Sequence, residues 1–302
     1  MLQKQTTRNK NLCNFGDQEL KTQDLNHLLE LMSKAALQAG EAILEIYNQP
    51  INPSYKSDGT PVTIADQRSE EIILDILETT GIPVLAEESA EAGKIPKLGS
   101  RFFVVDPLDG TKEFIKKNGE FTVNIALVEN GMPICGIVTA PALKYGFLGS
   151  RANGANEANG ANGANGAFEF AIMDNKQTNI KPLQVLSNGP LCIVSSRSHA
   201  KALPVNLQEF FDNCQEKPIG SSLKFCLIAN GKARIYPRFS PTCEWDTAAG
   251  QAVLEAAGGV VLALDGKPLS YGKSKSSFIN PFFIAADCKN LAQEVLQNIH
   301  QK

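Results

Sequence analysis

The sequence predicts a mixed α/β protein built from two halves. The first half opens with two amphipathic helical periods and continues as a run of neighbouring apolar strands, which is the order of an α+β unit. From Val185 strands and helices alternate, as they do in an α/β unit. The chain has 302 residues, enough for one large domain or two medium ones. We therefore expect halves at 24–186 and 187–302 with a cleft between them, and a flexible tail at 1–23.

Two helices are expected at the start of the first half. The first begins at Asp24, which is placed to cap it, and the turn-forming stretch 48–53 ends it. Its apolar face consists of Leu25, Leu28, Leu29, Met32, Ala35, Ala36, Ala39, Ile43 and Ile46. A turn-rich stretch at 56–61 separates this helix from a second one, expected between Thr63 and Thr80.

Short apolar runs then predict strands. They lie at 84–86, 101–105, 121–128, 134–139, 143–148 and 168–173. The pair Asn130-Gly131 between the third and fourth runs is a strong hairpin signal. Residues 152–167 repeat Asn-Gly-Ala units without an apolar period, so we expect a mobile loop there, with a series of tight turns as the alternative.

The second half alternates between the two kinds of element. Strands are expected at 192–195, near Lys217, and at 233–236, 260–264 and 282–285. Helices are expected at 205–211, 221–230, 246–257 and 287–299.

Composition excludes several classes of protein. Lys and Arg number 29 against 32 Asp and Glu, and this near-balance argues against a nucleic-acid partner. No stretch is long and apolar enough to span a bilayer, and the first twenty residues lack the apolar core of a signal peptide. The seven cysteines are scattered without a C-x-x-C pair, as expected of reduced thiols. We expect a cytoplasmic protein with no integral membrane segment.

The most informative local motif is D-P-L-D-G-T at 106–111, directly after an apolar strand. Proline stops strand pairing and glycine allows a sharp turn, so Asp106 and Asp109 can point into one space. The carbonyl of Leu108 can join them, and hard oxygen ligands of this kind suit Mg²⁺. The alternative is a β-turn in which the aspartates only satisfy backbone amides.

Three further acidic segments each have a purely structural alternative. Glu87 and Glu88 follow a strand and are costly to bury without a cation, but a solvated loop also explains them. Asp246, in W-D-T-A-A-G, is either a metal ligand or the cap of the helix that follows. The stretch 56–66, which ends at Asp66, needs no explanation beyond a turn and a helix start.

Taken together, the four segments resemble the lithium-sensitive, Mg²⁺-dependent sugar-phosphatase superfamily that contains the inositol monophosphatases. That family shows D-G-(T/S)-x-V-T-x-A-D, a paired E-E, D-P-(I/L)-D-G-T and W-D-x-A-A-G in this order, and all four are present between residues 56 and 259. The chain is most similar to the 3′(2′),5′-bisphosphate nucleotidase branch, through V-S-S-R-S-H at 194–199, G-S-S-L-K-F at 220–225 and Y-P-R-F at 236–239. The resemblance implies a layered αβαβα sandwich.

The resemblance also implies roles for the acidic residues. Glu87, Asp106 and the Leu108 carbonyl would hold one Mg²⁺, and Asp106, Asp109 and Asp246 a second, within a set of two or three ions. Asp66 and Thr111 would orient the attacking water and take its proton, so the implied catalytic residues are Asp66, Thr111 and Glu87. Gly110 and Thr111 would offer backbone N–H groups to the scissile phosphate.

Substrate specificity is expected from the second half. Lys224 and Arg238 are candidates for holding a second phosphate, because an arginine fork binds phosphate in two places. Arg197 and His199 could instead cap a helix, and Lys224 could be a solvated helix residue. The full substrate-binding set that we expect is Leu108, Asp109, Gly110, Thr111, Ser195, Ser196, Arg197, His199, Gly220, Ser221, Lys224, Arg238 and Asp246.

The function implied by the resemblance is Mg²⁺-dependent hydrolysis of the 3′-phosphate of adenosine 3′,5′-bisphosphate to AMP and phosphate, in support of sulfur assimilation. The sulfated nucleotide is a further candidate substrate. The alternatives are an inositol or sugar monophosphatase and a non-catalytic, metal-dependent binding module. The expected partner is a small nucleotide bisphosphate, the expected state a monomer or homodimer, and peripheral attachment to the cytoplasmic side of the inner membrane is a further option.

Overall fold

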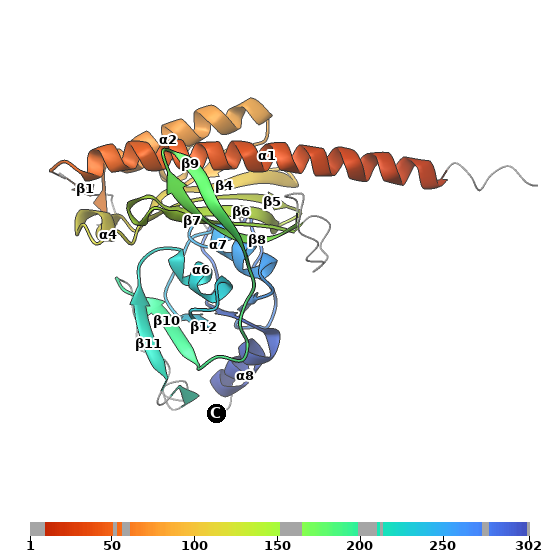
Figure 1. Cartoon of the computed structure of the whole chain (residues 1–302), viewed down its shortest axis with the longest axis vertical. Coiled ribbons are helices and arrows are strands. Elements are labelled where there is room, and N and C mark those ends of the chain that lie inside the picture. The colour runs from red at the N-terminus through yellow and green to blue at the C-terminus, as the bar shows by residue number, and fades with distance from the viewer. Residues whose placement is uncertain are drawn as a thin grey trace, which may run out of the picture.

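The computed structural model describes residues 10–50, 53–55, 61–151, 165–198, 210–211, 214–273 and 278–300. Within them the strands form a seven-stranded sheet (the larger sheet), a five-stranded sheet (the smaller sheet) and a two-stranded ribbon. Figure 1 shows helices above the larger sheet, helices between the two sheets, and a helix below the smaller one. This is the αβαβα sandwich that the family resemblance implies.

The larger sheet has the order β3-β4-β5-β6-β7-β8-β9. Its strands are β3 (Val84–Ala86), β4 (Arg101–Asp109), β5 (Thr122–Glu129), β6 (Met132–Ala140), β7 (Tyr145–Arg151), β8 (Asn165–Met173) and β9 (Lys176–Leu183). Only the β3–β4 pair is parallel, and the rest form an antiparallel meander, as the hairpin signal at Asn130-Gly131 predicts.

Two helices cover one face of this sheet. They are α1 (Lys10–Tyr47) and α2 (Ile64–Leu77), and the ribbon strands β1 (Ser54–Tyr55) and β2 (Pro61–Val62) lie between them in the chain. The predicted apolar face of α1 is buried against the sheet, and Met32, Ala36 and Ile43 are fully buried. Thr63 caps α2 in a capping box with Asp66, which fixes where this helix begins.

The smaller sheet has the order β11-β10-β12-β14-β13. Its strands are β10 (Cys192–Ser196), β11 (Gln215–Ile219), β12 (Ile235–Arg238), β13 (Val260–Ala263) and β14 (Phe283–Ala286). Helices α6 (Leu223–Ala229) and α7 (Ala248–Ala256) pack between the two sheets, and α8 (Lys289–His300) packs on the outer face. The short helices α3 (Glu87–Glu91) and α4 (Thr111–Ile115) follow β3 and β4, and 3₁₀ turns lie at Glu78–Thr80 and Pro141–Leu143.

Helix α7 lies unusually close to the larger sheet. A Cβ atom on Gly136 would be 2.7 Å from the Ala249 oxygen, and one on Gly149 would be 2.5 Å from Val253 Cα. Because both strand positions lack a side chain, the helix backbone can approach the sheet directly. The second half thereby packs its own helix onto the sheet of the first half.

The structure corrects the predicted elements at several places, and two predicted segments lie wholly or mostly outside the described residues. Residues 10–23 are helical and belong to α1, not to a tail, because a proline-free helix extends at little cost once it is nucleated. Residues 165–167 belong to β8, where they pair with β7 and so gain backbone partners. Strand β9 is missing from the prediction, because its mostly exposed residues show no apolar alternation. The rest of the loop at 152–164 and most of the helix expected at 205–211 lie outside the described residues.

The change from one sheet to the other falls between Leu183 and Cys192, so the expected boundary at 186 lies in the connecting segment. The division into two domains stays a prediction, since one hydrophobic cluster contains residues from both sheets and from α6 and α7. None of the described helices combines the length and apolar composition that crossing a bilayer requires.

Candidate active site

A cavity of about 340 Å³ contains most of the residues that the sequence singles out. From the first half its described lining includes Glu87, Asp106, Leu108, Asp109, Gly110 and Thr111. From the second half it includes Ser196, Gly220, Ser221, Lys224, Arg238 and Asp246. Asp66, Ser195 and Arg197 are not part of that lining, and His199 lies outside the described residues.

The turn after β4 positions the two aspartates. The pairing of β4 with β5 shifts register between Asp106 and Asp109, and this bulge changes the direction of the side chains. The Asp106 carboxylate accepts a hydrogen bond from the Leu108 N–H at 3.1 Å. Asp106 therefore does satisfy a backbone amide of the turn, as the β-turn alternative expects. Gly110 has φ 95°, a left-handed conformation that suits glycine, and it directs the chain into α4.

A buried hydroxyl connects two of the predicted metal ligands. Ser222 Oγ lies 2.8 Å from Asp109 Oδ2 and 2.9 Å from the Asp246 carbonyl oxygen. Asn124 Nδ2 donates to Ser222 Oγ at 2.9 Å and lies 3.4 Å from Asp109 Oδ2. One oxygen of Asp109 is therefore held by Ser222 and Asn124. Neither residue was singled out from the sequence, although a lone asparagine in an otherwise apolar strand is a signal.

Asp66 and Thr111 form the predicted pair. Thr111 Oγ1 donates to Asp66 Oδ1 at 3.0 Å, and the other oxygen of Asp66 accepts from the backbone and the hydroxyl of Thr63, each at 2.8 Å. Burial raises the pKa of Asp66 above its ordinary value, although these hydrogen bonds oppose the shift. A carboxylate with a raised pKa is better suited to take a proton.

Glu87 lies at the start of α3, beside two other acids. Its carboxylate oxygens and those of Glu88 and Glu91 come within 4.8 Å of one another. Glu70 on α2 fixes this helix start, because its carboxylate accepts from the backbone N–H groups of Glu88 and Ser89 at 2.8 and 2.9 Å. Glu91 also lines the cavity and was missed from the sequence.

Two buried cations also line the cavity. Lys224 is 5% exposed, so the alternative of a solvated lysine is wrong. Its ammonium donates to the carbonyls of Ile219 and Ser221, and burial lowers its pKa to about 8. Arg238 donates to the carbonyls of Ser240 and Pro241 at 3.1 and 3.0 Å and to the Tyr236 hydroxyl at 3.3 Å. A guanidinium has five N–H groups, so each terminal nitrogen retains one N–H beyond these contacts.

Asp246 is not the cap of α7. That helix begins at Ala248, and the Asp246 carboxylate instead accepts from the Cys243 N–H at 2.8 Å. Burial raises the pKa of Asp246 to about 7, and the nearby charge of Asp109 adds to the rise. A carboxyl group that is repelled by a neighbouring carboxylate in this way is stabilised by a bound cation.

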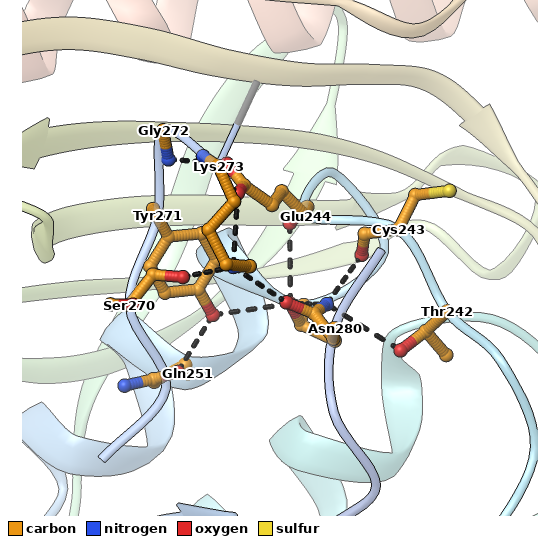
Figure 2. A network of polar contacts seen from close by, with 10 residues as sticks. Thr242, Cys243, Glu244, Gln251, Ser270, Tyr271, Gly272, Lys273 and Asn280 are labelled. Carbon is orange, nitrogen blue, oxygen red and sulfur yellow. Dashed lines mark hydrogen bonds and ion pairs between the residues drawn. The ribbon is translucent and has the colours of Figure 1, made fainter. Parts of the chain in front are cut away.

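A buried network holds the loop that carries this aspartate (Figure 2). Glu244 is fully buried and accepts from the backbone N–H groups of Gly272 and Lys273 at 2.6 and 2.8 Å. The Lys273 ammonium lies 2.9 Å from the Glu244 carboxylate, and Asn280 donates to the Cys243 carbonyl at 2.7 Å. These contacts tie the loop to segments 28 or more residues further along the chain and fix its conformation.

The charges of the cavity fit a site for divalent cations. Among the described residues six acidic side chains line it, namely Glu87, Glu91, Asp106, Asp109, Glu113 and Asp246. Only three basic ones do, namely Lys112, Lys224 and Arg238. An anionic ligand would be repelled by this excess of carboxylates unless cations neutralised it. Carboxylate and carbonyl oxygens are the ligands that Mg²⁺ prefers, and the described lining contributes no histidine.

Comparison with known proteins agrees with the fold and the site. A model of the inositol monophosphatase family matches residues 24–301, and the chain belongs to that family of metal-dependent phosphatases. The 3′(2′),5′-bisphosphate nucleotidase CysQ of Escherichia coli strain K12 is 43% identical over 261 residues, which are 85% of this chain and 98% of that protein. CysQ of Buchnera aphidicola is 40% identical over 264 residues, or 86% and 93% of the two chains.

Solved structures give the same picture. The crystal structure of CysQ from Bacteroides thetaiotaomicron, a bacterial member of the inositol monophosphatase family, matches with a TM-score of 0.69 and 36% identity, covering 86% of this chain and 97% of that one. An inositol monophosphatase from Anabaena matches with a TM-score of 0.68 at 23% identity, covering 92% and 97%, and supports the fold alone.

Proposed function

We propose that this chain is a Mg²⁺-dependent 3′(2′),5′-bisphosphate nucleotidase that converts adenosine 3′,5′-bisphosphate to AMP and phosphate. The observation that carries the proposal is a single cavity that is lined both by acids, here called the acidic wall, and by the two buried cations Lys224 and Arg238, here called the cationic wall. A substrate with two phosphates can place the scissile one against the acids and the other against Lys224 and Arg238. The CysQ relatives carry this activity in their names and match nearly their full length.

The acidic wall is the proposed place of hydrolysis. Glu87, Asp106 and the Leu108 carbonyl would hold one Mg²⁺, and Asp106, Asp109 and Asp246 a second. Bound Mg²⁺ supplies charge neutralisation for the phosphate and lowers the pKa of a water. Backbone N–H groups of Gly110 and Thr111 would donate to the phosphate oxygens.

Asp66 and Thr111 would move the proton. Since Thr111 gives its own hydrogen to Asp66, its oxygen retains lone pairs that can accept a hydrogen bond from a water in the cavity. As that water attacks phosphorus, its proton passes to the Thr111 oxygen while the threonine hydrogen passes to Asp66. The bond between phosphorus and the ribose 3′ oxygen breaks, and that oxygen leaves as a hydroxyl with a proton taken up from water. The raised pKa of Asp66 favours this transfer.

The cationic wall is the proposed source of specificity. Lys224 has one ammonium N–H beyond its two carbonyl contacts, and Arg238 has one on each terminal nitrogen. Together they can donate to a phosphate that is not cleaved. Ser196 and Ser221 also line the cavity and would add hydroxyl contacts.

A substrate panel tests the proposal. Phosphate release should be fast from adenosine 3′,5′-bisphosphate, slow from inositol 1-phosphate, and absent for both when Mg²⁺ is removed. The matched control is Asp109→Asn, which should fold but lose turnover, since an amide is a poorer ligand than a carboxylate. A preference for inositol phosphate would contradict the proposal and favour the monophosphatase alternative.

A further inference from the structure

We infer that Glu113 and Glu120 form a clamp that sets the spacing between the two walls of the cavity, and that Arg197 is a positioning residue of this clamp. The clamp, as named here, consists of Glu113 and Glu120 from the first half and Arg197, Ser198 and Gly220 from the second. The inference rests on the proposed function, because it concerns how a substrate with two phosphates reaches both walls at once.

Glu120 makes the central contact of the clamp. It lies just before β5, and its two oxygens accept from Arg197 Nε and Nη2 at 2.8 and 2.9 Å in a two-pronged ion pair. The oxygen that meets Nε also accepts from the Gly220 N–H at 2.8 Å. Arg197 Nη2 donates in addition to the Pro218 carbonyl at 2.7 Å. One carboxylate of the first half therefore binds the chain segments that follow β10 and β11.

Charge supports this contact. Partial burial acts to raise the pKa of Glu120, but the hydrogen bonds from Arg197 and Gly220 outweigh it, so the pKa lies below its ordinary value. The carboxylate is therefore ionised at neutral pH, and its partner is a guanidinium. Arg197 is not among the residues that line the cavity, so its expected role as a direct substrate contact stays a prediction, and the clamp gives it a different role.

A second carboxylate and a glycine complete the clamp. Ser198 Oγ donates to Glu113 Oε1, and Glu113 is 3% exposed. A Cβ atom on Gly220 would lie 2.6 Å from the Glu120 carbonyl oxygen and 2.7 Å from Glu113 Cγ. The two halves meet here so closely that only glycine fits, and the contact is both packed and hydrogen-bonded.

The clamp borders the cavity directly. Glu113, Ser198 and Gly220 belong to its lining, and Lys224 follows four residues after Gly220, in the first turn of α6. A substrate with two phosphates has to contact both walls together, whereas a monophosphate needs only the acidic wall. Loosening the clamp should therefore weaken binding of the bisphosphate selectively.

A double-mutant cycle tests the clamp. KM and kcat would be measured on adenosine 3′,5′-bisphosphate and on 3′-AMP for the wild type, Glu120→Ala, Arg197→Ala and the double variant. Each single change should raise KM for the bisphosphate about tenfold, with kcat within about twofold and little change for 3′-AMP. The double variant should be no worse than the worse single one, because both changes remove the same contact.

The competing explanation gives a different result. If Arg197 binds substrate directly, Arg197→Ala will raise KM by the same factor whether or not Glu120 is present, and the effects will multiply. That outcome would overturn the clamp. A wild type that fails to hydrolyse the bisphosphate would instead overturn the proposed function, so the two failures are distinguishable.

Three further variants serve as controls. Glu120→Gln keeps an oxygen for Gly220 and should recover part of the lost affinity. Gly220→Ala separates the halves sterically without a charge change, and should give the same selective rise in KM if its melting temperature shows that it folds. Glu71→Gln removes the exposed ion pair with Arg68, at 3.1 Å, and should change neither substrate's KM. A rise in KM with Glu71→Gln, or none with Gly220→Ala, would contradict the clamp.

Discussion

At the scale of single residues, Ser222 connects the two halves of the proposed metal site through one hydroxyl. That hydroxyl has one hydrogen and faces two acceptors, Asp109 Oδ2 at 2.8 Å and the Asp246 carbonyl at 2.9 Å. Because the hydroxyl has only one hydrogen, it donates to one of the two acceptors at a time, while Asn124 donates to its oxygen. Donation to Asp109 orients that carboxylate, and donation to the Asp246 carbonyl holds the backbone that carries the other proposed ligand.

We predict that Ser222→Ala weakens Mg²⁺ binding. Residues that orient metal ligands change metal affinity by about 10–100-fold when they are removed, and a shift in this range is expected here. Two measurements check it, the Mg²⁺ dependence of activity and direct binding of Mn²⁺ followed by electron paramagnetic resonance. Ser150→Ala, another buried serine outside the cavity lining, is the control and should bind metal normally. Unchanged metal affinity in Ser222→Ala would show that the hydroxyl has no positioning role.

Lys224 gives a pH prediction. Because burial lowers its pKa from about 10.5 to about 8, with nearby Asp109 partly offsetting the shift, the free protein loses this positive charge as the pH rises above 8. Phosphate binds the protonated form, so KM for the bisphosphate should rise above about pH 8. Lys224→Met should show a higher KM throughout and no additional rise there. Parallel pH profiles for the two proteins would mean that another group titrates.

At the scale of elements, the packing of α7 on the larger sheet depends on two strand glycines. A methyl group at Gly149 would meet Val253 Cα at 2.5 Å, a contact that neither backbone can relieve without moving. We predict that Gly149→Ala lowers the free energy of unfolding by about 1–3 kcal/mol, the usual cost of overpacking. Denaturation by urea measures this.

The control for that prediction is Gly99→Ala. A Cβ atom at Gly99 would meet nothing within 4 Å, and its backbone is not left-handed. Its stability should therefore change little. Equal losses in the two variants would contradict the proposed steric cause.

Elements with a strong internal pattern could be predicted from the sequence. The buried strand β4, the β5–β6 hairpin and the amphipathic part of α1 carry their apolar periods within a few residues. The short helices α3 and α4 and the edge strand β9 carry none, because helices of 5 residues are too short to show a helical period and β9 is mostly exposed. Element boundaries are similarly set by contacts, as Thr247 rather than Asp246 precedes α7.

The residues of the candidate site likewise fall into those that the sequence predicts and those that it does not. Its acids could be predicted because their residue types and spacing already indicate oxygen ligands. Ser222 could not, because its partner Asp109 lies 113 residues away, and the Glu120 partner of Arg197 is 77 residues away. Polar residues that act through distant partners leave no local period in the sequence, so only the fold identifies them.

At the scale of the whole molecule, the two halves share one hydrophobic cluster. It joins Val138 and Phe147 of the larger sheet to Val253 of α7 and Phe283 of the smaller sheet. Neither sheet can leave this cluster without exposing the apolar surface of the other, so separate unfolding of the halves would be costly. The proposed metal site spans the same division, because Asp109 and Asp246 come from different halves.

We therefore predict a single unfolding transition that Mg²⁺ moves to higher temperature. The protein has one tryptophan, Trp245, which is buried beside Asp246 and reports on the second half, while far-UV circular dichroism reports on both halves. The two signals should change at the same temperature.

Cations that bind only the folded state stabilise it, by about 2.7 kcal/mol at a hundred times their Kd, so the transition temperatures of both signals should rise together when Mg²⁺ is added. Asp109→Asn should lose most of that shift, since it removes one ligand of the ion that Asp109 and Asp246 would hold between the two halves. A tryptophan transition that precedes the dichroism change, or that alone responds to Mg²⁺, would mean that the halves unfold independently and that the shared cluster does not couple them.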